Sequence, residues 1–300
     1  DRIGTAGQFI YDLNCILDSR KRNFDIILQL GYTSSSIWSR LFPKKAILTT
    51  NMDGLEWKRT KYSKKVQKFL QYAESLAVKH SDHLISDSIG IQSYIQEKYA
   101  KRSTYIPYGA HVFKNPNETI LNNYNLKEQE YDLLIARLEP ENSIETILDG
   151  VTLSSSSRPF LVIGKHETKF GEYLKHKFKS DARIQFLGGI YNQEALNNLR
   201  YFSNIYFHGH TVGGTNPSLL EAMASSALIC AHDNIFNKTI LGEDALYFYS
   251  VESVTKSLNE FSKKTFPKLL EANIQKIQQI YSWDKIIGEY ECHFKAIFNT

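Results

Sequence analysis

A glycine-rich turn leads into a favoured helix start in the second half of the chain, and this combination can bind an anion. The residues concerned are Gly213, Gly214, Thr215, Asn216 and Pro217. Asparagine is a strong helix cap and proline a good first helical residue. A helix start offers a partial positive charge and backbone N–H groups without intrahelical acceptors. The sequence therefore predicts a phosphate-type site at this turn.

Glu221 lies just over one helical turn beyond Pro217, on the same face of the predicted helix. A carboxylate there is placed to accept hydrogen bonds from a sugar hydroxyl beyond the phosphate. Phosphate at the turn and ribose at Glu221 together describe a nucleotide. The alternative is an ordinary connection of an α/β fold with a solvated glutamate.

The elements that must position these residues alternate between short apolar runs and helical periodicity, which is typical of parallel-sheet α/β folds. The predicted strands are Phe24–Leu30, Ala46–Asn51, His83–Ser88, Thr104–Pro107, Tyr131–Ala136, Phe160–Gly164, Ile184–Gly188, Ile205–His208, Ala227–Ala231 and Ala245–Tyr249. A helix is expected around Val66–Ala77. Another is expected over Ser282–Phe298, with a buried stripe at Trp283, Ile287, Tyr290, Phe294 and Ile297.

The predicted organisation is two Rossmann-like parallel-sheet domains. We expect the first over 1–110, the second over 111–281 and a terminal helix over 282–300 that packs back on the first domain. The polar segment Lys114–Glu130 separates the two domains. The first has four predicted strands and no glycine-rich opening turn, so we expect it to lack its beginning.

Composition excludes several classes of protein. The 300 residues are 42% apolar and 23% charged, which suits a globular chain rather than a disordered one. The net charge of +4 is too small to indicate a nucleic-acid partner, and none is expected. No apolar run is long enough to span a bilayer. The three cysteines are far apart, which favours a reducing compartment over a disulfide scaffold. There is neither a G-x-G-x-x-G dinucleotide motif nor a P-loop.

Several blocks of the sequence resemble the rhamnosyltransferases of bacterial capsule and O-antigen clusters, which are retaining glycosyltransferases of family four with the GT-B fold. The blocks are NMDGLEWKRTK (51–61), AVKHSDHLISDS (77–88), YIPYGA (105–110), RLEPEN (137–142) and GHTVGGTNPSLLEAMAS (209–225). The resemblance implies that the two domains face a cleft, with the acceptor-side domain over 1–110 and the nucleotide-sugar domain over 111–281. It implies transfer of L-rhamnose from dTDP-L-rhamnose, with retention and without a metal, onto a polyprenyl-diphosphate-linked saccharide. We expect a cytoplasmic location at the inner face of the plasma membrane.

The resemblance also assigns roles to residues. Arg137 matches the arginine that holds the donor diphosphate, and the lysine expected five residues later is Asn142; Lys165 is a candidate for the missing charge. Apart from the resemblance, His210 is expected to contact the donor sugar or phosphate beside the glycine-rich turn. Gly213 stands where relatives carry a first glutamate, which puts the donor-sugar contacts in doubt.

Asn51 and Asp53 are expected to act on the reacting groups. They follow a predicted strand in the loop that the resemblance places near the donor sugar and acceptor. Asp53 would orient a hydroxyl, while the leaving diphosphate takes the acceptor proton. The alternative is a turn aspartate in the Asp53-Gly54 pair.

Trp57–Lys68 is rich in basic residues with two interleaved aromatic ones, which favours either an anionic membrane surface or a solvated helix face. His208 and His210 have no third ligand nearby, so no metal site and no cofactor besides the donor is expected. Two other functions remain open: another nucleotide-sugar enzyme, such as an epimerase, and a catalytically silent binding or assembly protein.

Overall fold

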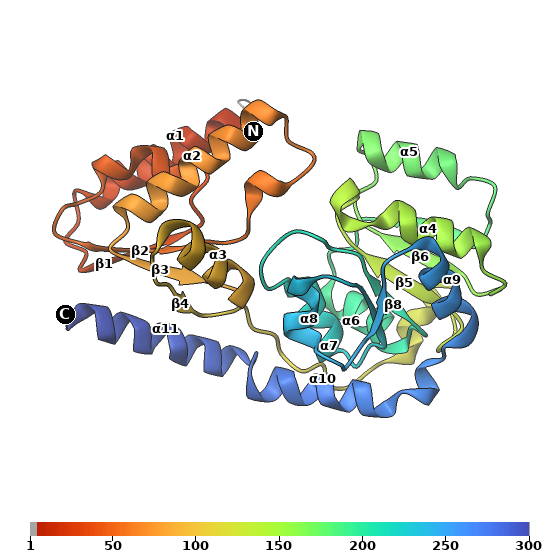
Figure 1. Ribbon diagram of the computed structural model, residues 1–300. Coiled ribbons are helices and arrows are strands. Elements are labelled where there is room, and N and C mark those ends of the chain that lie inside the picture. The colour runs from red at the N-terminus through yellow and green to blue at the C-terminus, as the bar shows by residue number, and fades with distance from the viewer. Residues whose placement is uncertain (1–4, 300) are drawn as a thin grey trace. The chain divides into compact units, whose positions relative to one another are not determined.

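The computed structural model describes residues 5–299, which form two compact units. The first comprises the described residues up to Pro107 together with those from Ile286 onward, and the second is Tyr108–Lys285. Each unit is an α/β fold around one parallel sheet, as Figure 1 shows. All ten strands predicted from apolar runs are present. Among the described residues, no helix is long and apolar enough to cross a bilayer.

The first unit contains a four-stranded sheet in the order β1-β2-β3-β4. Its strands are β1 (Ile26–Leu30), β2 (Ile47–Asn51), β3 (His83–Ser86) and β4 (Thr104–Tyr105). Its helices are α1 (Thr5–Ser19), α2 (Lys64–His80), α3 (Ile89–Tyr99) and most of α11 (Trp283–Phe298). Within this unit, α1 and α2 cover one face of the sheet and α11 the other (Figure 1).

The buried face of α11 matches the predicted stripe only in part. Ile297 is buried as predicted, whereas Ile287 is 53% exposed and the other buried positions are Ile286 and His293. The His293 ring reaches the sheet, with Nε2 2.9 Å from the Thr49 hydroxyl on β2. A histidine that hydrogen-bonds a buried threonine thus takes the place that the hydrophobic pattern gave to an apolar side chain.

The second unit contains a six-stranded sheet in the order β10-β9-β8-β5-β6-β7. Its strands are β5 (Asp132–Ile135), β6 (Phe160–Ile163), β7 (Ile184–Gly188), β8 (Tyr206–His208), β9 (Ile229–His232) and β10 (Leu246–Phe248). Its helices are α4 (Ile144–Leu153), α5 (Lys169–Lys177), α6 (Gln193–Phe202), α7 (Pro217–Ala224), α8 (Ile235–Leu241), α9 (Val251–Glu260) and α10 (Pro267–Gln279).

Neighbouring strand residues enter opposite faces of this sheet. Leu133 and Tyr206 pack with α6, α7, α8 and α10, while Leu134 and Phe207 pack with α4, α5 and α9. This alternation follows from the two-residue period of a β-strand. Because both faces are covered, the strands read as nearly continuous apolar runs, which is why the sequence located them.

The chain order of the strands creates a switch point beside β5. The chain runs outward from β5 through β6 to β7 and then returns to place β8 on the other side of β5. Connections at the carboxyl ends of β5 and β8 therefore diverge to opposite faces and leave a crevice between them. Ligands of open parallel sheets bind at such crevices.

Candidate functional site

A cavity of about 450 Å³ lies at this switch point in the second unit. Four residues that the sequence predicted for the donor site line it: Arg137, His210, Asn216 and Glu221. Its other lining residues are Ile135, Ala136, Ile190, Tyr191, Gln193, Leu196, Arg200, Pro217 and Ser218. The volume falls within the range of small-molecule sites. Gly213, Gly214 and Thr215 lie in the loop that leads to α7 and are not among the lining residues.

Arg137 follows β5 and is exposed, so its guanidinium is free to meet a solute. The turn behind it is held by Asn142, whose Nδ2 donates to the Arg137 carbonyl over 2.7 Å. Asn142 is buried and therefore acts as a cap for this turn rather than as a replacement cation. Lys165, the other candidate for the missing charge, does not line the cavity.

The loops after β5 and β8 are packed tightly together. A Cβ atom on Gly209 would lie 2.0 Å from the Asn142 carbonyl oxygen, so only glycine fits there. The Thr211 N–H and hydroxyl both donate to the Glu141 carbonyl, at 3.1 and 2.7 Å. This contact fixes Arg137 and His210 on one rim of the cavity.

Helix α7 begins where the sequence predicts, but the backbone N–H groups of its first turn are not free. Asn216 caps α7, with its Oδ1 accepting from the Ser218 N–H over 2.9 Å. The N–H groups of Leu219 and Leu220 both donate to the Asn216 carbonyl, and Pro217 has none. The expectation of several unpaired N–H groups in this first turn is therefore wrong, because the cap and a tight first turn use them.

The backbone N–H groups that lack an acceptor lie before α7, in the glycine-rich turn. Among the described residues, the N–H groups of Gly213 and Gly214 find no acceptor. Gly213 has a φ of +144° and open space around it, a conformation suited to glycine. A phosphate near this turn would meet these N–H groups beside the positive end of α7.

Glu221 is not the solvated carboxylate that the sequence suggested. Its Oε2 lies 2.6 Å from Nη2 of Arg200, a residue of α6 whose side chain is 1% exposed; the Glu221 side chain keeps 34% of its surface exposed. Sequence reasoning missed Arg200. The sequence feature that could have identified Arg200 is a cation at an apolar position of a helical stripe, four residues after Leu196.

Tyr191 is the second residue that the sequence reasoning missed. It follows β7, lines the cavity and is 86% exposed. A largely exposed aromatic ring beside a polar cavity offers a surface on which a planar group can stack. The signal was an aromatic residue in a loop at the carboxyl end of a strand.

The rings of His208 and His210 stack on each other, with their centroids 4.4 Å apart. His208 is buried, and neither ring nitrogen finds a hydrogen-bond partner among the described residues. Burial, followed by His210 and Arg200, holds the pKa of His208 well below its ordinary value of 6.5. His208 is therefore neutral. No group of three potential metal-ligating residues occurs in the part of the chain that is described.

Asn51 and Asp53 belong to the first unit. Asn51 ends β2 and is only 2% exposed, with its Nδ2 3.5 Å from the Tyr290 hydroxyl. Asp53 is exposed and lines a cavity of about 410 Å³ with Tyr62 and Phe69. Burial thus leaves Asp53, and not Asn51, open to a solute.

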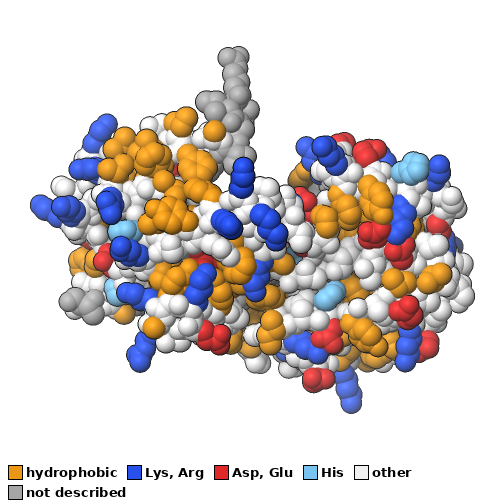
Figure 2. All heavy atoms as spheres, turned by 45° about the horizontal axis from the view of Figure 1, so that its top comes forward, with side chains coloured by type: hydrophobic (Ala, Val, Ile, Leu, Met, Phe, Trp, Pro, Cys, Tyr) orange, Lys and Arg blue, Asp and Glu red, His pale blue; other side chains and the backbone are white. Residues whose placement is uncertain are grey.

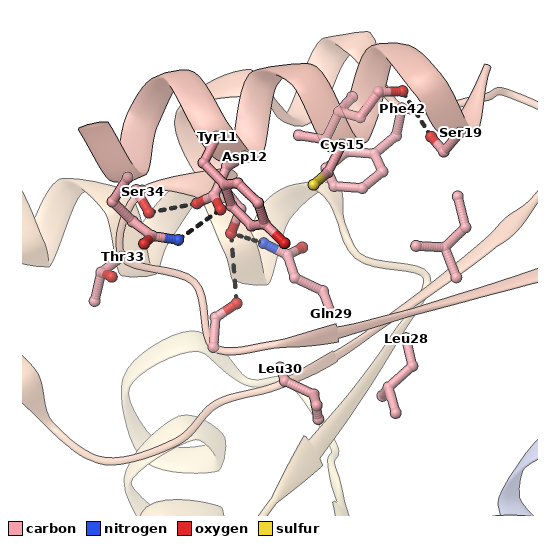
Figure 3. A pocket seen from close by; sticks show the side chains of 15 residues that line it. Tyr11, Asp12, Cys15, Ser19, Leu28, Gln29, Leu30, Thr33, Ser34 and Phe42 are labelled. Atoms are coloured by element: carbon pink, nitrogen blue, oxygen red, sulfur yellow. Dashed lines mark hydrogen bonds between the residues drawn. The ribbon is translucent and has the colours of Figure 1, made fainter. Parts of the chain in front are cut away.

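The first unit has a further cavity, of about 310 Å³, between α1 and β1 (Figure 3). Its polar groups bind one another. The Ser34 hydroxyl donates to Asp12, the Gln29 amide donates to Ser35, and Gln8 donates to Asp12 over 2.8 Å. It contains none of the predicted site residues.

The segment Trp57–Lys68 is anchored at one end by a buried carboxylate. Glu74 of α2 accepts from Trp57 Nε1 at 3.0 Å. Its other partners are the hydroxyls of Tyr32, Tyr94 and Tyr99 and the Lys98 ammonium. Trp57 is therefore a packed residue, whereas Lys61, Lys64, Lys65 and Lys68 are exposed.

Comparison with known proteins supports the fold. A domain family of unknown function, DUF1972, matches residues 37–111. No curated protein sequence matches the chain. Among solved structures, sucrose-phosphate synthase (tll1590) from Thermosynechococcus elongatus superposes with a TM-score of 0.79 at 16% identity, covering 99% of this chain and 80% of that one.

Two further structures give similar values. Anabaena Alr3699/HepE, in complex with UDP and glucose, has a TM-score of 0.78 at 14% identity, covering 99% of this chain and 84% of that one. A glycosyltransferase from Rickettsia africae ESF-5 has a TM-score of 0.73 at 14% identity, over 98% and 83% of the two chains. The chain has the fold of these proteins, GT-B, as the sequence predicted.

Proposed function

We propose that this chain is a glycosyltransferase whose nucleoside-diphosphate sugar donor binds in the cavity between the carboxyl ends of β5 and β8. The observation that carries the proposal is the gathering of Arg137, the cap of α7 and Glu221 around one cavity at the switch point of the sheet. The guanidinium of Arg137 and the positive end of the α7 dipole suit the diphosphate, and the carboxylate suits a pentose hydroxyl. The exposed ring of Tyr191 suits the base.

The likeness to solved glycosyltransferases supports the same function. The Anabaena HepE structures are described as complexes with UDP, with UDP and glucose, and with UDP-glucose. At 12–14% identity, these structures share a fold with this chain, and no residue role or substrate is carried over from them. The nucleotide assignment therefore rests on the cavity of this chain.

We assign dTDP-L-rhamnose as the donor and a polyprenyl-diphosphate-linked saccharide as the acceptor on the sequence resemblance alone. In the proposed reaction, the bond between the anomeric carbon and the diphosphate oxygen breaks, and a bond to the acceptor oxygen forms on the same face. The acceptor proton passes to the leaving diphosphate. Arg137 stabilises the negative charge that develops on that group. The role of Asp53 in orienting a hydroxyl stays a prediction.

The test is a transfer assay with dTDP-L-rhamnose, with UDP-glucose as the control donor. Lipid-linked saccharide from bacterial membranes serves as acceptor. We expect dTDP release that depends on acceptor, with the product anomer retained, as read by nuclear magnetic resonance. Conversion of the donor sugar into another sugar in the absence of acceptor would favour an epimerase. If the chain neither turns over the donor nor binds a nucleotide, an assembly protein would be favoured.

The exposed lysines and apolar side chains of the first unit support contact with an anionic membrane surface. Lys61, Lys64, Lys65 and Lys68 are exposed near Val66 and Tyr72, which are 39% and 57% exposed. Figure 2 shows hydrophobic side chains gathered with basic ones on this unit. Each cation near such a surface contributes about 1 kcal/mol. A lipid-linked acceptor would be reached from that surface.

A further inference from the structure

Arg200 is a buried cation in the wall of the candidate nucleotide cavity. Its side chain is 1% exposed, and Nη2 lies 2.6 Å from the Glu221 Oε2. A buried guanidinium is costly unless it is paired and hydrogen-bonded. Glu221 is the carboxylate that compensates it, so the two side chains form one unit across α6 and α7.

A second set of contacts fixes where the guanidinium lies. Nη2 is 3.3 Å from the Ser218 hydroxyl, and Nη1 is 3.2 Å from the Asn197 Oδ1. The Ser218 hydroxyl also lies 3.0 Å from the Tyr206 hydroxyl, and the Tyr206 ring centre lies 6.0 Å from the guanidinium carbon. Arg200 therefore holds both the first turn of α7 and the carboxylate one turn later.

This arrangement leaves the two oxygens of Glu221 unequal. Oε2 is engaged by Arg200, whereas Oε1 makes no hydrogen bond within the part of the chain described. A carboxylate with both oxygens free can hold the two neighbouring hydroxyls of a ribose side by side. With Oε2 held from behind, Glu221 presents one oxygen to the cavity.

We propose that Arg200 is a positioning residue that fixes Glu221 so that Oε1 accepts from a single pentose hydroxyl of the bound nucleotide. The proposal rests on the proposed function. Because the donor proposed above, dTDP-L-rhamnose, has no 2′-hydroxyl, the hydroxyl that Oε1 reads is the 3′-hydroxyl, and a 2′-deoxyribose is accepted. Arg200 acts on the nucleotide through Glu221 and not by touching it.

A purely structural ion pair would give a different result, because its loss would weaken all nucleotides alike. The readout is therefore a ratio of dissociation constants. For the 3′-hydroxyl, the ratio compares 3′-deoxy-dTDP with dTDP. For the 2′-hydroxyl, it compares 2′-deoxy-UDP with UDP. The dTDP-to-thymidine ratio serves as an internal control for the phosphate contacts of Arg137.

The experiment is calorimetric titration of the full 300-residue chain and of Arg200→Lys and Arg200→Met. For the wild type we expect 3′-deoxy-dTDP to bind roughly tenfold more weakly than dTDP, the cost of one hydrogen bond to a charged group. We expect UDP and 2′-deoxy-UDP to bind within about threefold, the limit for a hydroxyl that makes no directed hydrogen bond. The ratio of the 3′-deoxy-dTDP and dTDP dissociation constants should approach one in Arg200→Met. In Arg200→Lys it should lie between one and the wild-type value.

The possible results distinguish a failure of this inference from a failure of the proposed function. Intact dTDP binding with an unchanged 3′ ratio in both variants would overturn the role of Arg200 and leave the nucleotide site standing. No dTDP binding to the wild type would overturn both. Should Arg200→Met not fold, Arg200→Lys carries the test, because it keeps the buried charge but loses the fork that grips Oε2 and Ser218 together.

Discussion

The Oε2 of Glu221 lies 2.6 Å from Nη2 of Arg200, and these atoms join a partly exposed carboxylate to a fully buried cation. The pair makes Glu221 a structural residue as well as a candidate ligand residue. Substitutions of Glu221 therefore change folding stability and nucleotide binding together, and the two effects must be measured separately.

Glu221→Ala should lower the free energy of unfolding by about 2–3 kcal/mol, because it leaves the guanidinium of Arg200 without its carboxylate. Glu221→Gln keeps an oxygen acceptor for Nη2 and should cost about 1 kcal/mol. Urea denaturation followed by circular dichroism measures both. Equal losses for the two variants would show that the charge of Glu221 does not compensate Arg200.

Gly209→Ala should be destabilising by roughly 2–3 kcal/mol, since its Cβ would lie 2.0 Å from the backbone oxygen of Asn142 and neither loop can yield cheaply. The matched control is Gly288→Ala, at a position on α11 with nothing within 4 Å of the new Cβ. There, alanine should be neutral or stabilising by up to about 1 kcal/mol. Thermal denaturation of both variants checks the difference, and a harmless Gly209→Ala would contradict the close approach of the two loops.

Stability should fall as the pH drops below 6.5, because the unfolded chain then protonates His208 while the folded chain keeps it neutral. His208→Phe removes this difference and should flatten the slope by up to about 1.4 kcal/mol per pH unit. His232 and His293 shift in the same direction, so part of the slope remains.

Denaturation curves of the wild type and of His208→Phe between pH 5 and pH 8 measure this slope. The same slope in His208→Phe as in the wild type would mean that His208 titrates normally in the folded protein.

Replacing Lys64, Lys65 and Lys68 by glutamate should abolish sedimentation with vesicles that contain anionic lipid. Charge reversal changes the attraction by about 2 kcal/mol per site at low salt. The matched control reverses Lys44, Lys45 and Lys101, which are exposed elsewhere on the same unit. Equal loss in both variants would indicate a general charge effect, and binding to neutral vesicles would indicate that the lysines are not the cause.

The fold could be predicted from the sequence because its signals are local. Both faces of the second sheet are covered, so residues such as Leu133 and Leu134 are equally apolar and the strands stand out as runs. The cap of α7 was also local, since Asn216 and Pro217 specify a helix start between them. Arg137 was found through the resemblance carried by RLEPEN (137–142), which is also a local sequence signal.

The parts of the site that the sequence did not reveal depend on contacts between distant segments. The pairing of Arg200 with Glu221 joins two helices, and nothing within either helix requires it. The burial of Asn51 depends on α11, more than two hundred residues away. Whether the N–H groups in the first turn of α7 are free depends on how tightly that turn closes, which a sequence pattern does not determine.

Binding of a nucleoside diphosphate in the cavity beside Arg137 is tested most directly by calorimetric titration of the wild type and Arg137→Ala with dTDP and thymidine. Lys179→Ala, which removes an exposed cation outside the cavity, is the control. We predict that Arg137→Ala binds dTDP at least tenfold more weakly, through the loss of charged hydrogen bonds, while thymidine binding changes by less than about twofold. Absence of dTDP binding to the wild type, or equal losses for dTDP and thymidine in Arg137→Ala, would contradict the account.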